Sequence, residues 1–225
     1  IKYGHIWASS GCPGGDLFKI PEVEEEGRRL VDCGSIKVKC SPLRAVENFL
    51  DIAHFPFVHT DILGSEPHTE VHRYEVKIDQ KENEVWAKQI KFFQPKAAQS
   101  AETGITIEYM YRVVTPTSAI LYKTCPAKPW AWDIITLFVQ PLTETTCEVW
   151  AWMAIYDDAT NYADLVNFQQ MIFMQDRSIL ENQTPIKLPL DPGKEIPTQA
   201  DLTSVAYRRW LKKLNYTFGA EVVAV

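Results

Sequence analysis

Between residues 70 and 156 the chain carries six runs of strand-forming residues, joined by connections too short to hold a crossover helix. The runs are EVHRYEVKI, EVWAKQIKFF, ITIEYMYRVV, SAILYKTC, DIITLFVQPL and TCEVWAWMAIY. Neighbouring parallel strands need a connection of about a dozen or more residues, usually a helix. The spacing therefore predicts an antiparallel meander of six strands.

Helical patterns lie on both sides of these runs. Ser41 and Pro42 are a typical helix start, and apolar residues follow at helical spacing. Residues 162–183 and 200–215 are also helical in pattern, whereas residues 1–11 are rich in strand-forming types. The order helix, sheet, long helix, short helix predicts an α+β fold in which a curved antiparallel sheet wraps around the long helix, as in helix-grip (Bet v1-like) folds.

Composition narrows the class of protein. The 225 residues are 46% hydrophobic, enough for one domain over 1–225 with a substantial core. A net charge of −6 and the lack of a lysine- or arginine-rich run argue against nucleic-acid binding. No apolar run approaches the roughly 20 residues that span a bilayer, and the five cysteines form no C-x2-C pair. We expect a soluble, cytoplasmic protein with no membrane partner and reduced thiols.

The stretch ENFLDIAHFPFVHTDILG, residues 47–64, places two of the five histidines close to a carboxylate. On a helix, Asp51 and His54 are three positions apart and can touch. His59 is five positions after His54, about 140° around an unbroken helix, so the two imidazoles would diverge. Pro56 lies between them and is expected to bend the helix, which would bring His59 back toward His54.

A second carboxylate lies on the expected long helix. Asp176 falls on an apolar stripe, where a buried acid is costly unless it is paired or bound to a metal; the stripe consists of Leu165, Phe168, Ile172 and Ile179. Two histidines and one carboxylate are the ligands of a facial triad that holds Fe(II) and leaves positions open for dioxygen. Zinc accepts the same three ligands, and ordinary half-buried histidines are the simpler interpretation.

The segment NFLDIAHFPFVH resembles the D-x2-H-x4-H mononuclear-iron motif of Rieske-type aromatic-ring oxygenases. QDRSILENQ resembles the segment that supplies the third ligand in that family, and ADLTSVAYRRWL resembles its closing helix. The resemblance covers essentially the whole chain as the family's catalytic domain. It implies that His54, His59 and Asp176 bind iron and that Asp51 links the iron to the Rieske cluster of a neighbouring subunit.

The resemblance also implies cofactors and partners. Family members receive electrons from a reductase or ferredoxin through a [2Fe-2S] Rieske cluster, and the most similar branch forms homotrimers. That cluster needs C-x-H followed by C-x2-H, and no cysteine here has a histidine at either offset. We therefore expect the cluster in another part of a longer protein or in a partner, and only mononuclear Fe(II) in this chain.

Aromatic residues are dense in the predicted strands, which suggests an apolar cavity between sheet and helix. Ile105, Tyr122, Phe138 and Met171 are the residues that we expect to line it as substrate contacts. Asn48, one turn before the bridging aspartate, is expected to add a polar contact near the metal.

The leading hypothesis is an oxygenase domain that uses dioxygen to hydroxylate or oxidatively demethylate an aromatic compound. One alternative is a helix-grip module that binds an apolar ligand without metal chemistry; it predicts that the two histidines and Asp176 are far apart or separately hydrogen-bonded. Another is a zinc hydrolase with the same ligands, in which Asp51 would be the general base.

Overall fold

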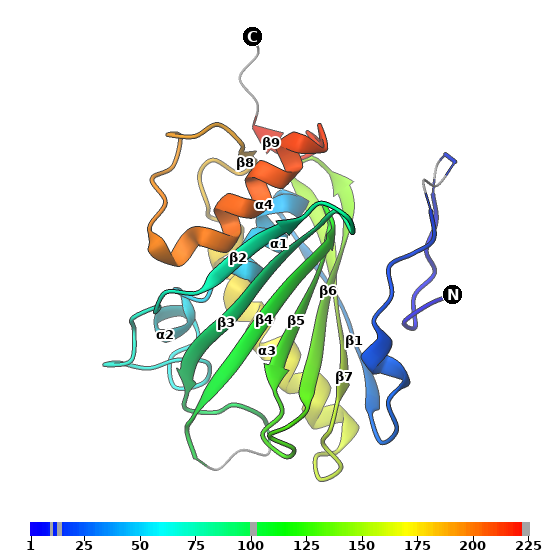
Figure 1. The fold of residues 1–225 in the computed structure, drawn as a ribbon, viewed down its shortest axis with the longest axis vertical. Coiled ribbons are helices and arrows are strands. Elements are labelled where there is room, and N and C mark those ends of the chain that lie inside the picture. Colours follow the sequence, from blue (N-terminus) through cyan, green and yellow to red (C-terminus); the bar gives the residue numbers. More distant parts are fainter. Residues whose placement is uncertain (10, 13–14, 100–102, 222–225) are drawn as a thin grey trace.

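A computed structural model of the chain describes residues 1–9, 11–12, 15–99 and 103–221. Seven strands form one antiparallel sheet in the order β1-β7-β6-β5-β4-β3-β2 (Figure 1). The six predicted strands are confirmed as β2 to β7, each paired with its neighbour in sequence. Their bounds are β2 Glu75–Asp79, β3 Glu84–Gln94, β4 Ile105–Thr115, β5 Ser118–Thr124, β6 Trp132–Thr143 and β7 Thr146–Ile155.

The first strand of the sheet was not predicted. β1, Arg29–Val38, pairs with β7 at the edge of the sheet, and its register shifts between Asp32 and Ser35. Gly34, in this bulge, has a φ of +71° that favours glycine. The expected strand within residues 1–11 is wrong: among the described residues of this segment only a bridge between Lys2 and His5 forms.

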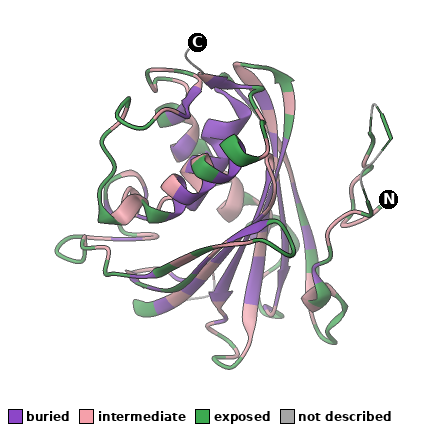
Figure 2. Cartoon of the chain, turned by 45° about the horizontal axis from the view of Figure 1, so that its top comes forward, coloured by how far each residue is buried: buried purple, intermediate pink, exposed green. Residues whose placement is uncertain are grey.

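The helices lie on one face of the sheet, which bends around them (Figures 1 and 2). α1 packs against β5, β6 and β7, α3 against β1, and α4 against β2 and β3. This arrangement confirms an α+β fold with a large antiparallel sheet. The bounds are α1 Pro42–Leu50, α2 Phe55–Val58, α3 Tyr162–Leu180 and α4 Leu202–Lys213, with short β8 Leu188–Pro189 and β9 Ala220–Glu221 and 3-10 turns at Pro21–Glu24 and Gln199–Asp201.

Both faces of the sheet are covered by apolar side chains. The larger core lies between the sheet and the helices, where Leu43, Tyr207 and Trp210 are fully buried. A smaller cluster on the opposite face packs beneath the N-terminal segment through Ile20 and the aromatic rings of that segment. No helix within the described ranges is long and apolar enough to cross a membrane.

Candidate metal centre

The segment between α1 and α2 carries the histidines in a different backbone from the one expected. α1 ends at Leu50, and the Asp51 carboxylate accepts the amide N–H of Ala53 at 2.9 Å, a local turn that competes with helix. His54 then caps the start of α2. Pro56 lies in the first turn of α2, where its missing N–H costs no helical bond. The expectation of one helix bent at the proline is therefore wrong, because the chain already turns at Asp51.

Two imidazoles and one carboxylate nevertheless meet at one point. The Nε2 atoms of His54 and His59 are 3.2 Å apart. Oδ1 of Asp176, on α3, lies 3.3 Å from Nε2 of His54 and 3.0 Å from Nε2 of His59. The three candidate ligand atoms thus lie within 4.8 Å of one another. This convergence contradicts the alternative in which the three side chains are far apart.

The donor set fits a divalent metal ion. Asp176 Oδ1 is buried and makes no hydrogen bond of good geometry with any described residue, although it approaches both imidazoles. The Nδ1 atoms, which face away from the shared point, are fixed by hydrogen bonds. Nδ1–H of His54 donates to Asp51 at 2.8 Å, and Nδ1–H of His59 donates to Gln175 at 2.8 Å. Each Nε2 can therefore present its lone pair to the shared point, as metal-binding histidines do.

Two carboxylates favour a proton on the cluster when no metal is bound. Burial alone would lower the pKa of His54, but the neighbouring carboxylates of Asp176 and Asp51 outweigh it and raise the pKa to about 9. Burial alone would raise the pKa of Asp176, but the neighbouring imidazoles outweigh it and lower the pKa to about 2. A cation bound at this point would replace a proton, so metal binding releases protons here.

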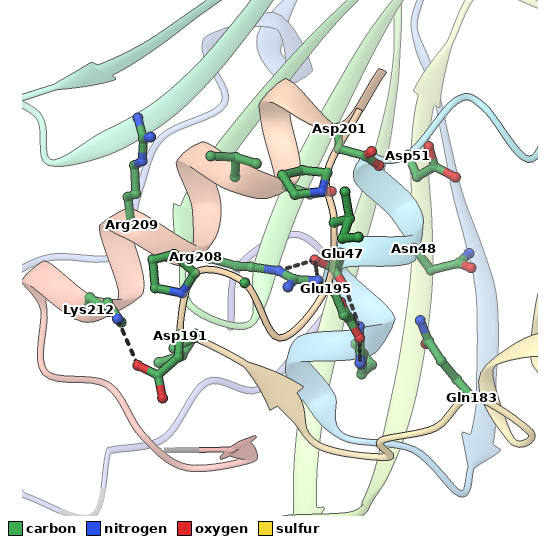
Figure 3. Close-up of a pocket in the computed structure, with 18 of the residues that line it drawn as sticks. Glu47, Asn48, Asp51, Gln183, Asp191, Glu195, Asp201, Arg208, Arg209 and Lys212 are labelled. Carbon is green, nitrogen blue, oxygen red and sulfur yellow. Dashed lines mark hydrogen bonds and ion pairs between the residues drawn. The ribbon is translucent and has the colours of Figure 1, made fainter. Parts of the chain in front are cut away.

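Two cavities adjoin the cluster, and they differ in size. The inner cavity, of about 80 Å³, lies between α3 and the sheet and is lined by His54, His59 and Asp176 together. The outer cavity, of about 440 Å³, is lined by Asp51 and His54, by α4 and by the loop 190–197 (Figure 3). The larger cavity therefore lacks two of the three candidate ligands, whereas the inner one, called the chamber below, opens on all three.

The outer cavity is bordered by a network of ion pairs that joins α1, α4 and the loop 190–197 (Figure 3). Arg44, which is 1% exposed, pairs with Glu47 at 2.9 Å and with Glu195 at 2.5 Å. Arg208 pairs with the same two carboxylates at 2.6 and 2.5 Å. Because every charge has a partner on another element, the network fixes the loop beside α1.

The four residues expected to contact substrate do not line the inner cavity. Tyr122 and Phe138 belong to the cluster on the opposite face of the sheet. Ile105, at the start of β4, is 37% exposed, and Met171 is 44% exposed on α3. Strand alternation explains the positions of Tyr122 and Phe138, since residues next to them in sequence face the chamber instead. Asn48 is half-buried and lines both cavities; its contact with a metal site stays a prediction.

Several residues of the site were not predicted. Gln175 directly precedes Asp176 in sequence, but only the structure shows that it accepts the hydrogen bond from Nδ1–H of His59. Gln94, Tyr109 and Lys123 line the inner cavity from β3, β4 and β5. A lysine on the same strand face as the apolar Ala119 and Leu121 would have been the signal for Lys123.

Comparison with known proteins identifies the family. Residues 38–216 match the model of the vanillate O-demethylase oxygenase C-terminal domain. The probable methylxanthine N7-demethylase NdmC of Pseudomonas sp. (strain TJI-51) is 48% identical over 217 residues, which cover 96% of this chain and 77% of that protein. The methylxanthine N3-demethylase NdmB of Pseudomonas putida is 26% identical, over 96% of this chain and 59% of its own length.

Solved structures share the fold. Pseudomonas putida CBB5 NdmA with caffeine superposes with a TM-score of 0.70 at 18% identity, over 88% of this chain and 55% of that one. Dicamba monooxygenase bound to 3,6-dichlorosalicylic acid gives 0.61 at 16% identity, over 88% of this chain and 62% of the other. This chain thus spans little more than half the length of these solved chains. With the family model matching most of its length, the chain belongs to the vanillate O-demethylase oxygenase C-terminal domain family, the catalytic domain of the Rieske-type oxygenases, which are oxidoreductases.

Proposed function

We propose that this chain is the catalytic domain of an iron-dependent oxygenase that removes a methyl group from an N-methylated aromatic heterocycle of the methylxanthine class. The observation that carries the proposal is the convergence of two Nε2 atoms on Asp176 Oδ1, a buried oxygen with no good hydrogen bond to any residue described. The substrate class is supported by 48% identity to a probable methylxanthine N7-demethylase over 96% of the chain.

His54, His59 and Asp176 would hold the iron. Bound Fe(II) supplies the activation of dioxygen, with electrons delivered through a Rieske [2Fe-2S] cluster located elsewhere. The chain's own residues prepare the site: Asp51 keeps the proton of His54 on Nδ1, and Gln175 does the same for His59. The apolar walls of the inner cavity exclude water from the reacting ring.

The wider assembly is also part of the proposal. We place the whole chain in a single catalytic domain of helix-grip type, with the cluster module in another part of a longer protein or in a partner. A reductase or ferredoxin would be the electron donor, and a cytoplasmic homotrimer would place the cluster of one subunit beside Asp51 of the next. The position of Asp51 beside the outer cavity supports this route, because its carboxylate is reachable there.

The zinc-hydrolase alternative lacks support in the geometry. Asp51 was its candidate general base, and the carboxylate already accepts the Nδ1–H of His54 and the amide of Ala53. A base that holds a ligand in place is not free to take a proton from a metal-bound water.

Metal binding tests the proposal first. The chain, stripped of metal and loaded with Fe(II) without air, should bind one iron per chain, measured by elemental analysis. His59→Ala should abolish stoichiometric binding, whereas His72→Ala, a matched change at a histidine whose side chain is 71% exposed, should leave it unchanged. Iron content that survives His59→Ala would refute the centre.

Turnover tests the proposed demethylation reaction. The full-length protein with its reductase should release one formaldehyde per methyl group removed from a methylxanthine, with one dioxygen and two electrons consumed. Dioxygen consumption without formaldehyde release, at full iron content, would refute demethylation but would leave the proposal of an iron centre standing.

A further inference from the structure

The sheet side of the inner cavity contains buried polar atoms that make no hydrogen bond to the described residues. Gln94 and Tyr109 are each 1% exposed and line the cavity. Oε1 of Gln94 and Oη of Tyr109 make no hydrogen bond to any part of the chain that the structure describes. Buried polar atoms without a partner are rare in native proteins and ask for an explanation. Two of them in one cavity indicate a partner that enters from outside.

Lys123 places an amino group, a hydrogen-bond donor, beside them. It lies directly opposite Tyr109 in the β4–β5 register, is 9% exposed and lines the same cavity. Its Nζ donates to the carbonyl of Ala97, and no carboxylate among the described residues lies within ion-pair distance. Asp133 is its neighbour on β6, but that carboxylate accepts the amide of Tyr156. Even a neutral lysine amine carries two N–H groups, so Lys123 keeps a donor for an acceptor in the cavity.

Much of the remaining lining is apolar. Phe55, Leu137, Ile172 and Phe173 are part of it, so a flat ring can pack between them while its edge meets the polar wall. The free volume of about 80 Å³ is small for a ligand site, so a bound ring must displace side chains at the rim. Leu63 and Phe168 line the cavity and are only half-buried, which makes them the side chains that can move.

We propose that Gln94, Tyr109 and Lys123 form a recognition wall for a ring that carries carbonyl oxygens and an N–H group on its edge. Lys123 Nζ and Tyr109 Oη donate to a ring carbonyl, and Gln94 Oε1 accepts from a ring N–H. This inference rests on the proposed function and deepens it, because it names the part of the substrate that side chains of the sheet recognise by hydrogen bonds. An unsubstituted aromatic hydrocarbon leaves Gln94 Oε1 and Tyr109 Oη without partners and is bound poorly.

Three nearly isosteric variants test the wall: Lys123→Met, Tyr109→Phe and Gln94→Leu. Dissociation constants are measured by calorimetry on the iron-loaded chain, with iron content and melting temperature recorded for each variant. The probes are theobromine, which has ring carbonyls and one ring N–H, caffeine, which has carbonyls and no N–H, and naphthalene, which has neither. Lys91→Met, an exposed lysine on the same sheet, is the matched control.

Lys123→Met and Tyr109→Phe should each weaken theobromine and caffeine about tenfold. Gln94→Leu should weaken theobromine to a similar extent and leave caffeine unchanged. Naphthalene should bind the three variants at least as well as it binds the original chain, and Lys91→Met should change nothing. Equal binding of both methylxanthines by all variants would mean that the wall holds only buried water, and would overturn the inference.

The outcomes separate this inference from the proposed function. If the original chain holds no iron but the variants still weaken the methylxanthines selectively, the metal centre fails and the wall stands. If iron and formaldehyde release are normal but the variants bind like the original chain, the wall fails and the demethylase stands. If the original chain binds neither methylxanthine, the wall is refuted even where naphthalene binds.

Discussion

Replacing Gln175 by leucine removes the acceptor that holds the outer nitrogen of His59. The 2.8 Å bond to Gln175 fixes the proton on Nδ1 and directs Nε2 at the cluster, and His59 is 1% exposed, so no water replaces the lost acceptor. Loss of such an outer partner typically costs about 10- to 100-fold in metal affinity, about 1.4 to 2.8 kcal/mol. The buried N–H left without an acceptor should also lower the free energy of unfolding of the metal-free chain by about 1–3 kcal/mol.

The assay is a competition between the chain and a chelator of known affinity for Fe(II) or Co(II), combined with urea unfolding of the metal-free form. Gln170→Leu is the matched control: this glutamine is also on α3 and half-buried, but it donates to the carbonyl of Cys33 and not to a residue of the candidate cluster. Gln175→Glu keeps an acceptor and should retain the affinity. The reasoning is wrong if Gln175→Leu binds metal as tightly as the original chain, or if Gln170→Leu loses as much affinity.

Two further changes test the fold around the site. Gly64→Ala should destabilise the chain by about 1–3 kcal/mol and weaken metal binding, since a Cβ there would lie 2.7 Å from the backbone nitrogen of Pro56 in α2. The control is Gly11→Ala, whose added Cβ meets nothing within 4 Å and should change neither property. Equal melting temperatures for the two variants would contradict this prediction. Glu195→Gln should flatten the loss of stability in acid. Burial raises the pKa of Glu195, but Arg44 and Arg208 outweigh it and lower the pKa, so its stabilisation is present above the ordinary pKa and lost as the pH falls through the folded one. Parallel curves of unfolding free energy against pH for both proteins would count against it.

The strands of the meander were predictable because each is a long run of strand-forming residues with a short connection on either side. β1 was not, because a bulge with Gly34 at positive φ and several charged residues interrupt its pattern. The N-terminal segment has the composition of a strand for another reason. Its rings, such as Tyr3 and Trp7, pack on the outer face of the sheet without pairing with an edge.

The convergence of the two imidazoles and the Asp176 carboxylate was predictable because a carboxylate on an apolar helix stripe needs a partner, whatever the backbone between the histidines does. The turn at Asp51 was not, since it depends on a local hydrogen bond to Ala53. The expected substrate contacts lie off the inner cavity for a physical reason. Both faces of the sheet are apolar, so residue type does not reveal which neighbour of a pair such as Leu121 and Tyr122 faces the chamber.

His54 lines both the inner and the outer cavity, and its side chain is 16% exposed. Asn48 also lines both, so the two spaces share an imidazole and an amide. A solute beside Asp51 and a ring beside Tyr109 would therefore meet the same imidazole, each from its own cavity.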